Sequence, residues 1–99
     1  MTIVTEAVAG SMESSDIMIT LAPWEGEGYE IELKSIVDKQ FGRSIRKVIS
    51  QTLQELGIES ARVVAVDLGA LDCAVRARVK TAAFRACQRQ DYNWEGENR

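Results

Sequence analysis

Alternation of apolar and polar residues predicts two half-exposed strands. In residues 17–23, IMITLAP, the residues Ile17, Ile19 and Leu21 fall on one face, and a proline ends the run. In residues 29–35, YEIELKS, apolar side chains alternate with glutamates and a lysine. The stretch WEGEG between them supplies two glycines for a loop. The pair therefore predicts a β-hairpin with a longer loop.

A helical repeat follows the second strand. Apolar or small side chains recur every three or four residues, at Phe41, Ile45, Val48, Ile49, Thr52 and Leu56. SIVD, residues 35–38, fits a capping box, with Ser35 as the N-cap and Asp38 at the third helical position. Gly57 follows the last periodic residue, where a left-handed cap is common. These signals predict a helix from residue 35 to residue 57.

The remaining segments complete the pattern. Residues 61–67, ARVVAVD, are mostly apolar and β-branched, which predicts a strand covered on both faces. From Ala70 onward the apolar positions fit either a helical stripe (71, 75, 79, 82, 86) or alternation (71, 73, 75, 77, 79). The alanine content and the continuation past residue 80 favour a helix to about Arg89, with a strand and a short helix as the alternative. Residues 7–12 predict a short strand or an extended arm, and residues 91–99, with Trp94, predict a polar tail.

Together these elements predict an α+β fold for residues 1–99 as one domain. Its sheet would contain the hairpin and one central strand, with residues 7–12 as an optional N-terminal strand, packed against two α-helices. Ninety-nine residues allow only one core.

Composition and charge narrow the class of protein. The 45% apolar and 27% charged residues are usual for a soluble chain. No apolar run approaches the roughly 18 residues that span a bilayer, and the N-terminus lacks a signal-peptide pattern, so a cytoplasmic protein is expected. A net charge of −3 argues against a nucleic-acid partner. Two basic clusters, RSIRK (43–47) and RARVK (76–80), are typical of a solvated face and are candidate docking points for an acidic partner.

Few residues of the chain are candidates for catalysis or metal binding. The chain has no histidine, which excludes Ser-His, Cys-His and His-metal sites. Cys73 and Cys87 show no CxxC spacing, and we expect them to be small core residues. Asp67 and Asp72 resemble a carboxylate pair, but no base or ligand set accompanies them. A stand-alone enzyme is not expected.

The serine-rich stretch SMESSDIM, residues 11–18, invites two interpretations. Its side chains favour a turn between two strands, which is the commoner role. Alternatively, an exposed serine could be modified by another enzyme, which requires no base within this chain. Glu13 and Asp16 are ordinary turn residues, and they would repel a phosphodiester placed on a serine between them. Such repulsion favours an extended, mobile appendage.

Several stretches together resemble the citrate lyase acyl carrier proteins, the gamma subunits of citrate lyase. They are AVAGSMESSDIMI (7–19), VDKQFG (37–42), GALDCAVRARV (69–79) and the late WE (94–95). The resemblance covers nearly the whole chain in the same order. Lys80 departs from it, because an acid is expected after RARV. The chain lacks the Asp-Ser-Leu motif of ordinary acyl carrier proteins, so their four-helix bundle is not expected.

The resemblance implies a carrier and not a catalyst. Members bear 2'-(5''-phosphoribosyl)-3'-dephospho-CoA, which a prosthetic-group transferase joins through a phosphodiester to a serine that corresponds to Ser14. The group carries acetyl and citryl thioesters between the alpha subunit, an acyl transferase, and the beta subunit, a citryl lyase, as citrate is cleaved to oxaloacetate and acetate. The carriers of malonate decarboxylase and citramalate lyase are alternatives, although GALDC favours citrate lyase. An unmodified small interaction subunit is an alternative of a different class.

Overall fold

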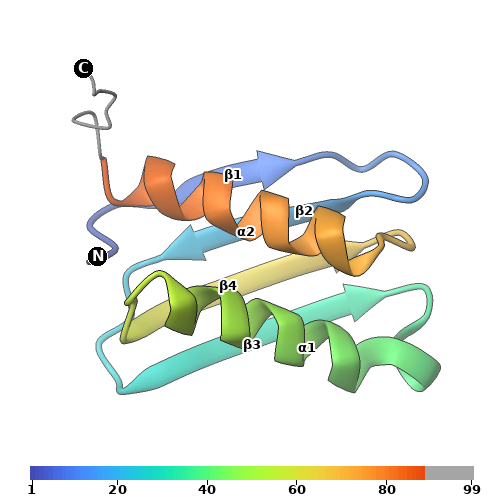
Figure 1. Cartoon of the computed structure of the whole chain (residues 1–99), viewed down its shortest axis with the longest axis horizontal. Helices are drawn as coiled ribbons and strands as arrows, with labels where there is room; N and C mark the ends of the chain where they lie inside the picture. The colour runs from blue at the N-terminus through green and yellow to red at the C-terminus, as the bar shows by residue number, and fades with distance from the viewer. Residues whose placement is uncertain (89–99) are drawn as a thin grey trace.

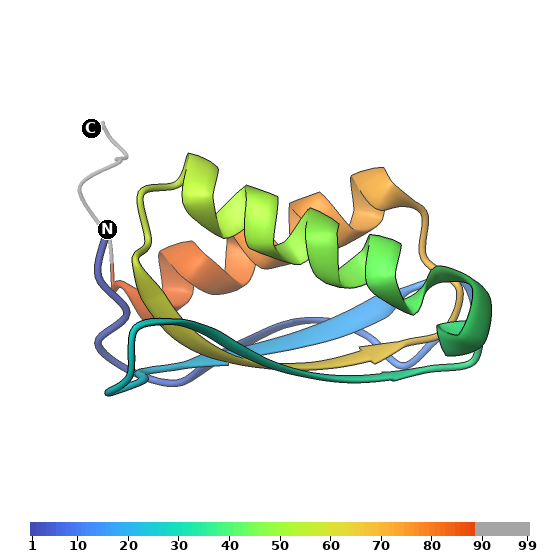
Figure 2. The same cartoon turned by 90° about the horizontal axis from the view of Figure 1, so that it is seen from below.

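The computed structural model describes residues 1–88, which form a four-stranded sheet and two helices. In chain order the elements are β1 (Ala7–Gly10), β2 (Ile17–Ala22), β3 (Gly28–Ser35), α1 (Asp38–Glu55), β4 (Ser60–Asp67) and α2 (Asp72–Ala86). Both helices lie against the same face of the sheet (Figures 1 and 2). The predicted α+β class and the N-terminal strand are confirmed. The predicted tail at residues 91–99, with Trp94, lies outside the described residues.

The strand order is β1-β2-β4-β3, so the predicted hairpin between β2 and β3 is wrong. Strand β4 lies between them, antiparallel to β2 and parallel to β3. The hairpin is formed by β1 and β2, with Ala9 opposite Ile19. Parallel strands need a crossover connection, and α1 supplies it between β3 and β4. The loop between β2 and β3, residues 23–27, therefore passes one end of β4, which comes later in the chain.

The core lies between the sheet and the two helices. Ile17, Ile19 and Leu21 of β2 are fully buried, as their alternation predicts. In β4, Ala61, Val63 and Ala65 are buried, whereas Val64 and Val66 on the other face are only half-buried. The central position of this strand is confirmed, but its predicted cover on both faces is wrong. The helices cover one face of the sheet and leave the other open (Figure 2).

Helix α1 begins later than predicted, because β3 extends to Ser35, which pairs with Asp67. The capping box is wrong: the hydroxyl of Ser35 accepts a hydrogen bond from the Val37 amide at 3.0 Å and donates one to Asp67 at 2.8 Å. At the other end, the Gly57 amide donates to the Gln54 carbonyl at 3.0 Å. The predicted helix end at Gly57 is thereby confirmed.

Residues 72–86 form one helix, which confirms the favoured interpretation of the ambiguous segment. Its buried face consists of Val75, Val79, Ala82, Ala83 and Ala86. Leu71, predicted to begin this stripe, precedes the helix and is exposed. Cys73 is exposed on the first turn and Cys87 is half-buried, so the prediction of a core position is wrong for Cys73. The helix ends at Ala86, with Cys87 as its C-cap and a positive φ of 54° at Gln88, so it is shorter than the predicted extent to about Arg89.

Three connections gather at one end of the molecule (right in Figure 1). They are residues 11–16 between β1 and β2, residues 36–37 before α1, and residues 68–71 before α2. These connections form what is named below the serine end. The N-terminus and the connections 23–27 and 56–59 lie at the opposite end. Among residues 1–88, no helix has the length and apolar character needed to cross a membrane.

Candidate functional site

The serine turn, residues 11–16, is held firmly against the connection before α2. The Ser15 amide donates to the Leu68 carbonyl at 2.8 Å, and the Leu68 amide donates to the Asp16 carbonyl at 2.9 Å. Within the turn, the Asp16 amide donates to the Glu13 carbonyl at 3.1 Å. Ser15 has a positive φ of 65°, so the chain reverses sharply just after Ser14. The turn is therefore a fixed projection of the fold.

A charged pair fixes the end of this turn. The carboxylate of Asp16 accepts hydrogen bonds from Arg78 of α2, from Nε at 3.1 Å and from Nη2 at 2.9 Å. It also accepts bonds from the Ser11 hydroxyl at 2.5 Å and from the Ile17 amide at 2.7 Å. The bonds from Arg78, Ser11 and the Ile17 amide, in that order, hold the pKa of Asp16 well below its usual range. The same pairing raises the pKa of Arg78.

This pairing changes the expected electrostatics of the turn. The sequence suggested that Glu13 and Asp16 would both repel a phosphodiester placed between them. The structure instead turns the Asp16 carboxylate to Arg78, so its charge is compensated, and only Glu13 is left as an exposed acid of the turn. Arg78 belongs to the RARV motif that the sequence analysis singled out. Sixty-two residues separate it from Asp16 in the chain, so the sequence did not indicate that the two side chains meet.

The three serines of the turn are not equivalent. The hydroxyl of Ser11 is engaged by Asp16. Ser14 and Ser15 are exposed, and neither hydroxyl takes part in a hydrogen bond within residues 1–88. Both are central residues of the turn that the bond from the Asp16 amide to the Glu13 carbonyl closes, and the backbone of Ser15 is also bonded to Leu68. Two hydroxyls are thus accessible, and Ser14 is chosen by its position in the family motif, so its role stays a prediction.

The two aspartates of DLGALDC have separate structural settings. Asp67 is buried at the end of β4, and its carboxylate accepts hydrogen bonds from the Ser35 hydroxyl at 2.8 Å and from the Ala70 amide at 2.9 Å. Asp72 is exposed on the first turn of α2. Asp67 thus ties together the connections on which the serine turn rests. The described residues contain no group of three His, Cys, Asp or Glu side chains placed to hold a metal ion.

Acid is expected to weaken the fold through Asp16. A carboxyl whose pKa is lowered in the folded state stabilises that state fully above its ordinary pKa of 3.8, and the contribution is lost as the pH falls below that value. The wild type should therefore exceed Asp16→Asn in free energy of unfolding at about pH 6, and the difference should shrink at about pH 3.

Urea titrations of both proteins at the two pH values measure this difference. Asp72→Asn is the matched control, because Asp72 is exposed and forms no ion pair within residues 1–88. It should follow the wild type at both pH values. A gap between wild type and Asp16→Asn that is the same at both would contradict the assignment.

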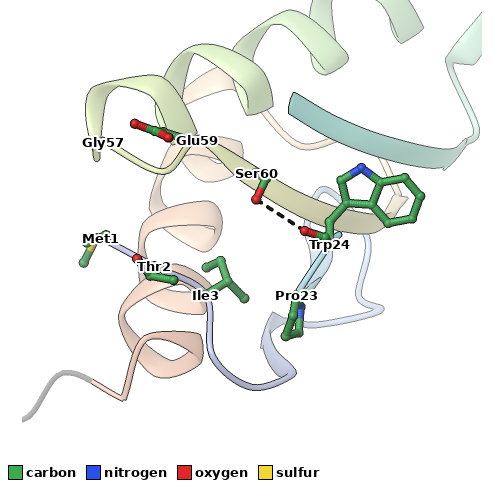
Figure 3. A pocket seen from close by; sticks show the side chains of 8 residues that line it. All are labelled: Met1, Thr2, Ile3, Pro23, Trp24, Gly57, Glu59 and Ser60. Atoms are coloured by element: carbon green, nitrogen blue, oxygen red, sulfur yellow. Dashed lines mark hydrogen bonds between the residues drawn. The ribbon is translucent and has the colours of Figure 1, made fainter. Parts of the chain in front are cut away.

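A separate hollow of about 440 Å³ lies at the opposite end of the molecule (Figure 3). Met1, Pro23, Trp24 and Glu59 are among its lining residues, and the Ser60 hydroxyl donates to the Trp24 carbonyl at 3.4 Å. Trp24 is half-buried there. The hollow contains one carboxylate and lies far from the serine turn along the longest axis of the molecule, so it is not part of the serine site.

Known proteins share both the sequence and the fold. A family model described as "Malonate decarboxylase delta subunit (MdcD)", within the acyl carrier proteins, matches residues 4–86. The citrate lyase acyl carrier protein of Streptococcus mutans is 55% identical over 89 residues, which cover 90% of this chain and 87% of the relative. That of Serratia proteamaculans is 45% identical over 98 residues, covering 99% of this chain and 96% of the relative. The chain belongs to the citrate lyase acyl carrier protein family.

This membership confirms the resemblance that the motifs indicated, and with it an acyl carrier role. A chain in the crystal structure of a Pseudomonas malonate decarboxylase hetero-tetramer in complex with malonate has a TM-score of 0.68. That match covers 85% of this chain and 86% of the other, at 17% identity, so it shows a shared fold alone. The fold is the sheet with two helices, and not a helical bundle.

Proposed function

We propose that this chain is the acyl carrier subunit of a citrate lyase complex and bears 2'-(5''-phosphoribosyl)-3'-dephospho-CoA on Ser14. The observation that carries the proposal is the exposed Ser14 hydroxyl in a hydrogen-bonded turn. It is supported by identities of 45–55% to citrate lyase acyl carrier proteins over most of the chain. The role requires cytoplasmic partners: a prosthetic-group transferase, the alpha acyl transferase and the beta citryl lyase.

The residues of the turn fit a covalently attached anionic group. Ser14 is exposed, so a phosphodiester there displaces no packed side chain. The carboxylate of Asp16 is already paired with Arg78, which reduces the repulsion that a nearby phosphate would meet. The uncompensated charge of Glu13 favours a group that extends away from the surface. When bound, the group supplies a thiol that holds acyl units as thioesters.

The protein's own contribution is to present the tether point. Hydrogen bonds between Ser15, Leu68 and Asp16 hold the turn against the connection before α2. Arg78 fixes it to α2, so the tether point keeps one place relative to the rest of the fold. Covalent attachment then raises the effective concentration of the acyl unit at each catalytic subunit in turn. The carrier itself needs no acid, base or metal for this task.

Reconstitution tests the proposal. The chain is co-expressed with the enzymes that make and attach the prosthetic group, and intact mass is measured; we expect a gain of one group per chain. The loaded carrier, mixed with citrate lyase alpha and beta subunits, should convert citrate to oxaloacetate and acetate, whereas the carrier alone should not. A chain that stays unmodified under these conditions would be an interaction subunit, and the proposal would fail.

The same experiment separates the closest alternative. The family model and the solved structure both name malonate decarboxylase, so its carrier is the second candidate. Identities of 45–55% to citrate lyase carriers, against 17% to the solved chain, favour citrate lyase. If the loaded chain supports malonate decarboxylation or citramalate cleavage with the corresponding subunits, but not citrate cleavage, the substrate assignment is wrong.

A further inference from the structure

Exposed apolar side chains gather at the serine end. Seven large hydrophobic residues are exposed in the described part of the chain, and three of them lie in the serine end: Met12, Ile36 and Leu71. A fourth, Phe41, lies beside them in the first turn of α1. Each of the four exposes more than half of its surface. The sequence pattern placed Phe41 and Leu71 in core-facing stripes, but the structure leaves both outside. A concentration of such side chains on one surface is typical of an interaction site.

This apolar surface adjoins the serine turn. A Cβ atom placed on Gly69 would lie 3.9 Å from Cδ1 of Ile36 and 4.0 Å from Cα of Ser15, so Ile36 and the turn meet at one point. A groove of about 350 Å³ runs between the starts of α1 and α2, with Phe41 and Leu71 among its lining residues. Gly69 also lines the groove, so one end of the groove lies beside Ser15, the residue that follows Ser14.

The cations of α2 and those of α1 differ in whether they are paired with acids. Two arginines of RARVK are engaged: Arg78 pairs with Asp16, and Arg76 lies 3.7 Å from Glu55. On α1, the cations Lys39, Arg43 and Lys47 are exposed and form no ion pair within residues 1–88. Their spacing of four residues places them along one side of the helix. This concentration of positive charge stands out in a chain of net charge −3.

We propose that the serine end and the basic side of α1 form the docking surface for the catalytic subunits, whose complementary surface is apolar at its centre and acidic beside it. The inference rests on the proposed function, because a catalytic subunit that receives a group tethered to Ser14 must approach this end. The protruding side chains of Ile36 and Leu71 supply the apolar contact. Lys39 and Arg43 steer and orient an acidic partner surface.

Binding of the loaded full-length carrier to purified citrate lyase alpha and beta subunits tests the surface. Leu71→Ser should weaken the Kd for at least one subunit by about tenfold, since a residue near the centre of a contact is removed. Serine is also a favoured residue at the position before a helix, so the fold should be retained. Arg43→Glu should weaken the Kd by about fivefold and reduce its dependence on salt.

Two variants at other places serve as matched controls. Val4→Ser removes an exposed apolar side chain from the N-terminal segment, and Lys80→Glu reverses an exposed charge on α2. Both should bind within about twofold of the wild type, because they lie outside the proposed contact. Thermal unfolding of every variant checks that the fold is unchanged.

Other outcomes would overturn the proposal. If Leu71→Ser and Arg43→Glu bind as the controls do, the surface is wrong. If wild-type carrier sediments as a dimer that Leu71→Ser dissociates, the groove joins two copies of this chain. If Leu71→Ser leaves the Kd unchanged but alters the reactivity of the loaded thiol toward a small reagent, the groove holds the prosthetic group. A wild type that gains no mass contradicts the proposed function instead, which intact mass reveals before any binding is measured.

Discussion

Replacing Ser14 with alanine is expected to abolish covalent loading completely while leaving the folded state intact. Alanine has no oxygen that could form the phosphodiester. The side chain is exposed and its hydroxyl makes no hydrogen bond within residues 1–88, so the free energy of unfolding should change by less than about 0.5 kcal/mol. Intact mass after co-expression with the attachment enzymes measures loading, and urea unfolding measures stability.

The neighbouring serines provide controls on the same turn. Ser15→Ala removes the other accessible hydroxyl and should still be loaded. Ser11→Ala removes a donor to Asp16, so we expect loading together with a measurable loss of stability. If Ser14→Ala is still loaded, or if Ser15→Ala is the only variant that is not loaded, the attachment point is Ser15 and not Ser14. The three variants therefore decide between Ser14 and Ser15, which are both exposed.

The largest loss of stability is expected for Gly10→Ala, at the end of β1 just before the serine turn. A Cβ atom there would lie 1.9 Å from the carbonyl oxygen of Ile17, which belongs to the backbone of the paired strand β2. The φ of 100° adds the strain of a conformation that L-residues rarely adopt. Because the β1–β2 backbone must move apart, the free energy of unfolding should fall by about 3–5 kcal/mol in a urea titration.

Gly28→Ala separates steric clash from backbone strain. Gly28 also has a positive φ, of 79°, but no atom lies within 4 Å of a Cβ placed on it. Its substitution should cost only the conformational strain, about 1–2 kcal/mol. Equal losses for the two variants would mean that the clash at Gly10 is relieved without cost. A Gly10→Ala carrier that remains folded should also load more slowly, since the turn that presents Ser14 is displaced.

Local pattern was sufficient for most of the elements. Alternation in residues 17–22 and the helical repeat through Ile45, Ile49 and Thr52 reflect burial of one side of each element, and burial is what the structure shows. The ambiguous segment after Ala70 was decided correctly by alanine content, because helix propensity acts within the segment itself. The serine turn was likewise recognised from its residue types.

Partners distant in the chain could not be predicted in this way. Periodicity shows that β2 and β3 are strands, but not that β4 enters between them, since pairing depends on the packing of α1 over the sheet. The same limit applies to Ser35, whose hydroxyl is taken by Asp67 rather than by the helix. It applies also to Asp16, whose charge is compensated by Arg78. Leu71 and Phe41 fit a core pattern, yet both are exposed: Leu71 is the N-cap before α2, and Phe41 lies in the first turn of α1.

The contact between Asp16 and Arg78 has a consequence for the order of events during synthesis. Ser14 leaves the ribosome before the groups that hold its turn, the Leu68 carbonyl and the Arg78 guanidinium, which come much later in the chain. A nascent chain that stops short of α2 therefore exposes the serine without its support. An attachment enzyme that recognises the fixed turn would act only on carriers whose chain is complete through α2, so incomplete carriers would not consume the prosthetic group.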